Sequence, residues 1–138
     1  MQRLARLLTL SAIAIVFSSA AALAQTQTDS NEDSCATFKQ ADALLNKSYN
    51  QVLSEYRKNA AFIRKLRVAQ RAWIAYRDAQ IEALYPATDK RAEYGSVYPM
   101  CRCSALATLT TQRADELKKW IDGAEEGDVC SGSIRIRN

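Results

Sequence analysis

Four cysteines carry the clearest chemistry in this sequence of 138 residues: Cys35, Cys101, Cys103 and Cys130. Cysteines of this kind either bind a metal or form disulfides. The sequence has no histidine, and a C-x-C pair is not a common zinc spacing, so we expect disulfides and no metal. The lack of histidine also removes the usual general base. We therefore name no catalytic residue and no cofactor. The alternative of a glycan hydrolase that uses two carboxylates would need two facing acids in a cleft, and the sequence offers no such pair.

A polar and aromatic set with helical spacing offers a second kind of chemistry. Asp42, Asn46 and Tyr49 are four and three residues apart, so they share one face of a helix. The set could be a binding strip or part of a buried polar network. We favour the network, because buried polar groups are usually satisfied by hydrogen bonds inside the protein.

Two arginines are candidates for that network. Arg113 falls within an apolar stripe, and a buried guanidinium has to be paired. We expect Arg77 or Arg113 to pair with a carboxylate from a different helix, with Asp42 and Asp78 as the first candidates.

The stretch from residue 69 to residue 79 must position several of these groups. It has no Gly or Pro and is rich in helix formers. Gln70, Trp73 and Arg77 share one face, with Tyr76 and Asp78 nearby. We expect Trp73 to be a core residue, largely buried against the first and third helices, rather than a platform for a ligand.

The segment from residue 85 to residue 100 is the longest irregular connection. It holds Tyr85, Tyr94 and Tyr98. Because exposed tyrosines often anchor interfaces, we expect a protein partner to contact this segment, including its acidic residues Asp89 and Glu93. Within it, we expect Gly95 to supply an unusual backbone angle and Ser96 to cap the following helix.

Hydrophobic periodicity predicts three helices. They run from about Ser34 to Lys58, from about Ala60 to Leu84, and from Pro99 or Cys103 to Ile121. Residues 89–93 form a short turn, and Gly123 ends the last helix. The predicted fold is an all-α, up-down-up bundle. Each helix has an expected apolar stripe. The first helix has Phe38, Ala41, Leu45, Tyr49, Val52 and Tyr56. The second has Phe62, Leu66, Ala69, Trp73 and Tyr76, and the third has Leu106, Leu109, Arg113, Leu117 and Trp120.

The two ends of the chain are expected to lie outside this bundle. Residues 1–24 predict a cleaved signal peptide, with Arg3 and Arg6 before an apolar run and a cleavage pattern ending at Ala24. Residues 25–34 predict a disordered lead-in, residues 35–122 the helical domain, and residues 123–138 a loosely ordered tail tethered by Cys130. Loss of two arginines with the leader lowers the formal net charge from +4 to +2, too balanced to predict nucleic-acid binding.

One basic region stands out against that balance. Six basic residues occur between positions 57 and 71: Arg57, Lys58, Arg64, Lys65, Arg67 and Arg71. They could meet peptidoglycan or an acidic partner, but a solvated helix face is the simpler interpretation.

The order of several motifs resembles the family of LprI-type lysozyme inhibitors. The resembling blocks are Asp42-x-x-Leu45-Asn46-x-x-Tyr49, Ala69-Gln70-x-x-Trp73-x-x-Tyr76-Arg77-Asp78, Gly95-Ser96-x-Tyr98-Pro99 and Leu109-Thr110-x-x-Arg113-x-x-x-Leu117. Together they run through most of the chain after the leader. The family usually has cysteines where this sequence has Ile81 and Ala105.

The resemblance implies an exported, non-enzymatic binding protein that occludes the cleft of a lysozyme. It would act in the periplasm or outside the cell, with lysozyme or another envelope protein as partner, and no membrane partner once the leader is removed. The alternative is an envelope module that binds another protein or peptidoglycan without inhibiting lysozyme. Animal lysozymes are basic, so a chain of net +2 would need local acidic residues for electrostatic complementarity.

Export and an even number of cysteines favour two disulfides. Neighbours in a C-x-C pair would close a very small ring, so two maps remain, with Cys35 joined to either Cys103 or Cys101 and Cys130 joined to the other. An up-down-up bundle permits both, because it places the starts of the first and third helices together. We take Cys35–Cys103 with Cys101–Cys130 as the working map, which requires the tail to run back along the third helix.

Overall fold

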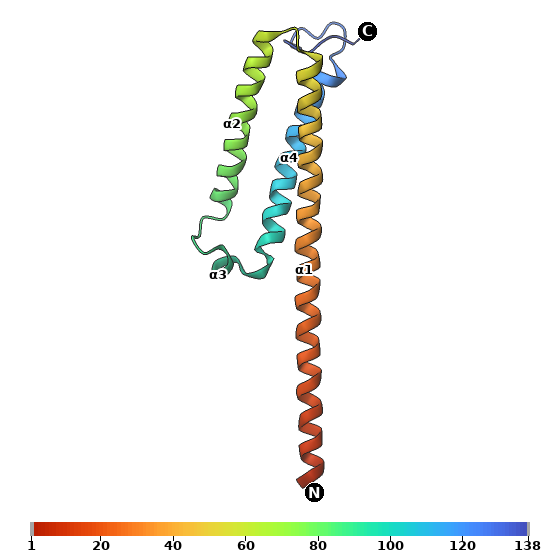
Figure 1. The fold of residues 1–138 in the computed structure, drawn as a ribbon, viewed down its shortest axis with the longest axis vertical. Coiled ribbons are helices and arrows are strands. Elements are labelled where there is room, and N and C mark those ends of the chain that lie inside the picture. Colours follow the sequence, from red (N-terminus) through yellow and green to blue (C-terminus); the bar gives the residue numbers. More distant parts are fainter. Residues whose placement is uncertain (1, 138) are drawn as a thin grey trace.

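Three long helices, running up, down and up, form the protein (Figure 1). The computed structural model describes the backbone of residues 2–137 and the side chains of residues 26–137. The long helices are α1 (Gln2–Glu55), α2 (Ala60–Leu84) and α4 (Tyr98–Asp122). A short helix α3 (Lys90–Tyr94) and a 3-10 turn η1 (Gly95–Val97) connect α2 to α4. The predicted all-α fold is confirmed.

The first helix begins well before the predicted start at Ser34. Residues 25–34 are helical within α1, so the predicted disordered lead-in is wrong. A pair of long-range contacts holds this part of α1. The Asn31 side chain donates to the Ser96 carbonyl at 3.2 Å and accepts from the Met100 N–H at 3.2 Å. The polar composition of the segment did not reveal these partners.

The predicted leader, residues 1–24, lies outside the residues whose side chains are described. From residue 26 onward, no helix is both long enough and apolar enough to cross a membrane.

The helix ends follow from local chemistry. The side chain of Asn59 accepts a hydrogen bond from the Phe62 N–H and caps α2, and Asp89 caps α3 through the Arg91 and Ala92 N–H groups. Gly123 ends α4 with φ at +78°. A Cβ at Gly123 would also lie 2.8 Å from the Arg135 carbonyl oxygen, so both the backbone angle and the close approach of the tail require glycine there.

Helices α1 and α4 lie side by side in the same direction and pack through small residues. Ala41 and Ser48 of α1, and Ala107 and Ala114 of α4, are all at most 8% exposed. Each pair is seven residues apart, which is two helical turns along one face. Small side chains at these positions let the two backbones approach closely. Ala41 belongs to a predicted apolar stripe, but the other three do not, because small residues do not stand out in a hydrophobic pattern.

The largest buried side chains meet where all three long helices come together. Leu45, Val52, Leu66, Ala114 and Leu117 form the core cluster with Tyr56, which follows the last turn of α1. From α2, the buried residues are Leu66, Gln70 and Ile81. The predicted α2 stripe was therefore partly wrong: Ala69 is exposed, and Tyr76 is 55% exposed.

Thr110 is a polar residue buried without compensation. It is fully buried in α4, and its hydroxyl has no hydrogen-bond partner among the described residues. Burying an unpaired hydroxyl is unfavourable, and valine has nearly the same shape. We expect Thr110→Val to raise the free energy of unfolding by up to about 1 kcal/mol in denaturant titration.

Thr108→Val is the control for that change. Thr108 is exposed on the same helix, and its hydroxyl donates to the Ser104 carbonyl at 3.1 Å. Thr108→Val should therefore not raise the free energy of unfolding. A loss of stability in Thr110→Val would show that the buried hydroxyl has a partner, such as a trapped water.

A single disulfide is formed within the described part of the chain. Cys35 of α1 bonds Cys103 of α4, with Cα atoms 4.9 Å apart, which confirms this half of the predicted map. Cys101 and Cys130 are free thiols, so the predicted second bridge is wrong. Cys101 lies at the start of α4 and Cys130 lies beyond its end, which separates them by about 30 Å of helix.

The tail explains why Cys130 does not return. The tail stays at the end of α4, where the Ala124 N–H donates to the Arg135 carbonyl and the Arg137 N–H donates to the Ala124 carbonyl, both at 2.8 Å. The Trp120 indole N–H donates to Ser133 Oγ at 3.0 Å. The tail is therefore ordered by backbone and side-chain hydrogen bonds, and the predicted tether through Cys130 is wrong.

Candidate interaction surface between helices α2 and α4

The three tyrosines of the segment 85–100 form one cluster. Tyr85 follows α2, Tyr94 ends α3 and Tyr98 begins α4. Their ring centroids are 5.1 to 5.9 Å apart, and all three side chains are half-buried. Burial is the main cause that raises the pKa of Tyr85 above its ordinary value of 10.0, followed by the nearby Cys101 and tyrosines. The mutual packing of the three rings holds the connection together, and each side chain stays partly exposed to solvent.

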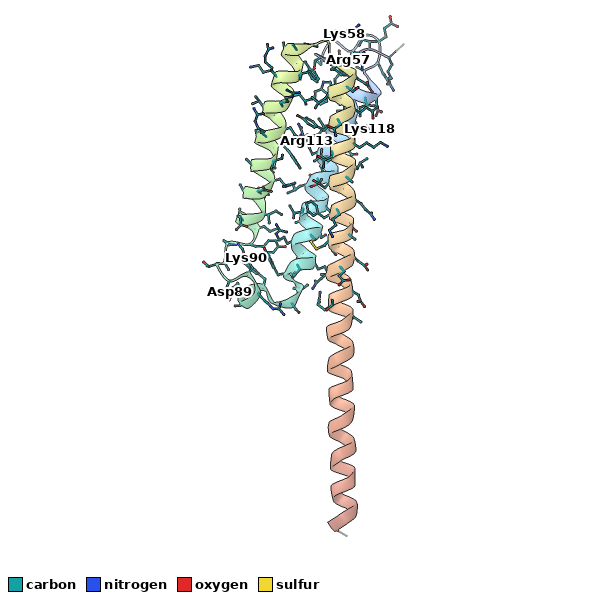
Figure 2. The ribbon with its side chains drawn as sticks, in the orientation of Figure 1. Arg57, Lys58, Asp89, Lys90, Arg113 and Lys118 are labelled. Atoms are coloured by element: carbon teal, nitrogen blue, oxygen red, sulfur yellow. A yellow bond between two sulfur atoms is a disulfide. The ribbon has the colours of Figure 1, made fainter. Side chains whose placement is uncertain are left out.

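Hydrogen bonds reinforce the cluster. Lys90 Nζ donates to the Tyr85 carbonyl and forms an ion pair of 2.8 Å with Glu82, and the Ala87 N–H donates to the Tyr94 hydroxyl at 3.2 Å. Figure 2 places Asp89 and Lys90 together at this end of the molecule. Of the two predicted acidic contacts, Asp89 is engaged as the cap of α3, while Glu93 is exposed. The connection is thus a built structure and not an irregular loop.

A cavity of about 320 Å³ adjoins the cluster, between α1 and the start of α4. It is lined by Gln27, Thr28, Asn31, Arg91, Gly95, Ser96, Tyr98 and Pro99. Gly95 has φ at +70°, which confirms the predicted unusual angle. Ser96 does not cap α4 with its side chain; its carbonyl accepts the bond from Asn31. Two segments far apart in the sequence, residues 27–31 of α1 and residues 91–99, therefore meet at this cavity.

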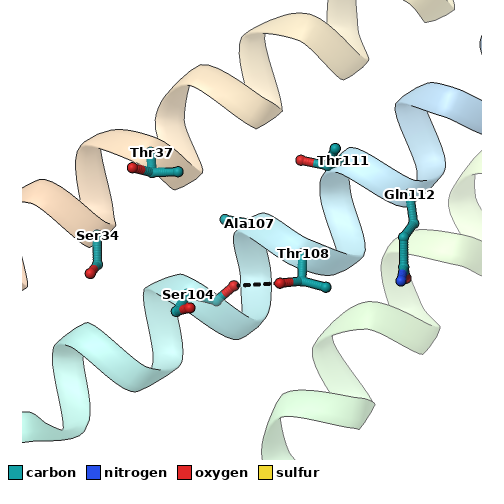
Figure 3. A pocket seen from close by; sticks show the side chains of 7 residues that line it. All are labelled: Ser34, Thr37, Ser104, Ala107, Thr108, Thr111 and Gln112. Carbon is teal, nitrogen blue, oxygen red and sulfur yellow. Dashed lines mark hydrogen bonds between the residues drawn. The ribbon is translucent and has the colours of Figure 1, made fainter.

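A larger hollow of about 470 Å³ lies between α1 and α4 (Figure 3). Its lining is neutral and short: Ser34, Thr37, Ser104, Ala107, Thr108, Thr111 and Gln112. Because it has no charged side chain, it offers neither a general acid nor a general base. It contains none of the residues singled out from the sequence.

The predicted polar strip on α1 does not form a buried network. Asn46 donates to Asp42 at 3.0 Å within an exposed part of the same helix, and Tyr49 packs against the core. No described arginine pairs with Asp42. The expected link from Asp42 to a neighbouring helix is therefore wrong, because the two residues satisfy each other locally.

The two arginines also pair within their own helices. Arg77 binds Asp78 at 2.8 Å, and Arg113 binds Glu116 at 2.8 Å. The contact of Arg113 with another helix is to a neutral group: its Nε donates to Gln70 Oε1 of α2 at 3.1 Å. The predicted cross-helix carboxylate is thus replaced by a buried glutamine.

Gln70 should be needed for this contact. It is 7% exposed, and Gln70→Ala would leave Arg113 Nε without its acceptor in a nearly buried position. We expect a loss of about 2 kcal/mol in the free energy of unfolding, measured by denaturant titration. Gln80→Ala, an exposed site on the same helix, should change stability little. Equal losses in both would show that the contact contributes nothing.

Trp73 is less buried than predicted. Its ring is half-buried and packs against the core cluster, and the Arg77 guanidinium lies 5.4 Å from the ring centroid. The guanidinium lies over one face of the indole ring. Gln70, Trp73 and Arg77 do share one face of α2, as their spacing predicted.

Comparison with known proteins decides the family. The family described as "Lysozyme inhibitor LprI" matches residues 18–117, most of the chain. The chain belongs to the LprI family. The uncharacterized protein R02472 of Rhizobium meliloti (strain 1021) is 35% identical over 113 residues, which cover 74% of this chain and 78% of that protein. No solved structure matches the chain.

The LprI motif residues serve two purposes in this structure. Leu45, Gln70, Thr110 and Leu117 are buried where the helices meet. Gly95, Ser96, Tyr98 and Pro99 line the cavity beside the tyrosine cluster. Where the resemblance leads us to expect cysteines, this chain has Ile81, which is 3% exposed, and Ala105, which is half-buried.

Proposed function

We propose that this protein is an exported lysozyme inhibitor that covers the cleft of the enzyme with the surface around the tyrosine cluster. One observation carries the proposal. The motif from Gly95 to Pro99, part of the LprI pattern, both lines the 320 Å³ cavity and supplies Tyr98 to the cluster. Export would follow from the leader, with cleavage after Ala24, and the protein would act in the periplasm or beyond without being an enzyme.

Local charge supports a basic partner at this end. Asp29, Glu32 and Asp33 are exposed on the part of α1 beside η1, and Glu93 is exposed on α3. Their carboxylates place negative charge at this end of a chain whose formal net charge, which already counts them, is positive; Arg91, also exposed on α3, is an opposing charge there. Charge complementarity of this kind raises the association rate and orients the encounter with a cationic enzyme.

The test is hydrolysis of bacterial cell walls by an animal lysozyme in the presence of increasing amounts of the exported protein. We expect inhibition that saturates near equimolar protein. Glu93→Lys should weaken it by reversing a charge at the contact, whereas Glu126→Lys, in the exposed tail at the opposite end, should not. Full lysozyme activity at a large molar excess of the folded protein would reject the proposal and favour an envelope module that binds a different protein or peptidoglycan.

A further inference from the structure

The first half of α2 carries a surface that the proposed function does not use. No acidic residue occurs between Arg57 and Arg77. The six basic side chains of this region are all exposed and form what we call the basic face: Arg57, Lys58, Arg64, Lys65, Arg67 and Arg71. Figure 2 marks its upper end by Arg57 and Lys58.

Helical geometry gathers three of these charges into a stripe. Arg64, Arg67 and Arg71 follow one another at three and four residues, so they lie on one side of α2, along about 10 Å of its axis. The three side chains are exposed on a flank of α2 next to the side that carries its buried residues Leu66 and Gln70.

The charges on this stripe have no internal partners. Among the described residues, no carboxylate lies within ion-pair distance of Arg64, Lys65, Arg67 or Arg71. By contrast, Arg77, Lys90, Arg113, Lys118, Arg135 and Arg137 each have an acidic partner. Other cations without an ion pair among the described residues are scattered over α1, α3 and α4, whereas Arg64, Lys65, Arg67 and Arg71 fall within two turns of α2.

Exposed apolar side chains lie among these cations. Val68, which is 54% exposed, lies on the outer side of α2. Ile74, which is 41% exposed, lies at the edge of that side. A soluble polyanion would attract the arginines but would gain little from Val68 and Ile74. The boundary between lipid headgroups and acyl chains would gain from both kinds of side chain.

We propose that the basic face docks this protein on the surface of an anionic phospholipid bilayer. The guanidinium groups bind lipid phosphates, and Val68 and Ile74 enter the headgroup layer. The sequence led us to expect no membrane partner, and the proposed docking differs from that expectation. It is peripheral binding through a folded surface and needs no spanning helix.

The second half of α2 sets the orientation. Asp78 and Glu82 continue the stripe of Arg64, Arg67 and Arg71 towards the tyrosine cluster. They are paired with Arg77 and Lys90, so this half of the stripe offers no unpaired positive charge to an anionic surface. The protein should therefore dock by the start of α2 and keep the tyrosine cluster in solution, where a protein partner can reach it.

The test is co-sedimentation of the exported protein with lipid vesicles. The N-terminus of the protein is determined first, to show that the leader is absent. We expect binding to phosphatidylcholine vesicles that contain phosphatidylglycerol, no binding to phosphatidylcholine alone, and loss of binding at high salt. The triple variant Arg64→Gln, Arg67→Gln, Arg71→Gln should bind on the order of 100-fold more weakly.

A matched triple variant separates the basic face from total charge. Lys39→Gln, Lys47→Gln and Lys119→Gln remove the same charge from exposed positions on α1 and α4 and should reduce binding far less. Equal loss in both triples would overturn the proposal. So would a Val68→Ser, Ile74→Ser variant that binds vesicles as well as the native protein, or stronger binding to soluble polyphosphate than to vesicles, since both outcomes identify a polyanion site.

Discussion

Replacing Cys35 and Cys103 together by alanine should lower the free energy of unfolding by about 4 kcal/mol. The bridge joins residues 68 positions apart, and a cross-link over a loop of that length removes much conformational freedom from the unfolded chain. Alanine is preferred to serine because Cys103 is 6% exposed and a hydroxyl there would need a partner. Denaturant titration of the oxidised native protein and of the double variant measures the difference.

Cys130→Ala is the matched control for the loss of a thiol. Cys130 is exposed and free, so its replacement should change stability by no more than about 0.5 kcal/mol. If the double variant were no less stable than Cys130→Ala, the Cys35–Cys103 bridge would not contribute to the stability of the bundle. The single variants are less informative, because Cys101 lies two residues from Cys103 and offers a replacement partner for Cys35.

Leu117→Ala should have an effect of similar size, about 3–5 kcal/mol. Leu117 is 0% exposed in the cluster formed by α1, α2 and α4, so its truncation leaves a cavity that three packed helices cannot readily close. The matched control is Leu44→Ala, the same change at a side chain that is 49% exposed on α1. Thermal or denaturant unfolding that placed both variants within 1 kcal/mol of each other would show that the core at Leu117 is loosely packed.

Local chemistry allowed most of the fold to be predicted. Asn59, Tyr85 and Gly123 mark helix ends through capping, a following proline and a positive φ, all of which are written in neighbouring residues. The up-down-up order of the helices predicted that Cys35 bonds either Cys101 or Cys103, but it did not distinguish between these two partners. These features depend on short-range sequence or on topology alone.

The features that escaped prediction depend on contacts between distant residues. The helical lead-in rests on Asn31 meeting Ser96 and Met100. The route of the tail rests on Ala124 pairing with the backbone near Ile136. Hydrophobic periodicity reports which face of a helix is apolar, but it does not report which polar group completes a contact on another helix.

The structure changes the predicted character of the segment 85–100, and its contact with a partner stays a prediction. The segment 85–100 was expected to be irregular, with tyrosines available to a partner. Their mutual packing, with centroids as close as 5.1 Å, requires α2, α3 and α4 to be placed together first. For the same reason Gln70 was recognised as sharing a face with Arg77, while its true partner, Arg113, was not foreseen.

The side-by-side, same-direction packing of α1 and α4 has a consequence for the order of assembly. Synthesis proceeds from the N-terminus, so the apolar face of α1 is made first and its main partner is made last. Residues as far apart as Leu45 and Leu117 must meet, and such distant contacts slow folding because the intervening chain has to be ordered at the same time. A nascent chain of this protein therefore holds an unfinished bundle until α4 is complete, and during that interval its exposed helix faces are the part that chaperones must protect.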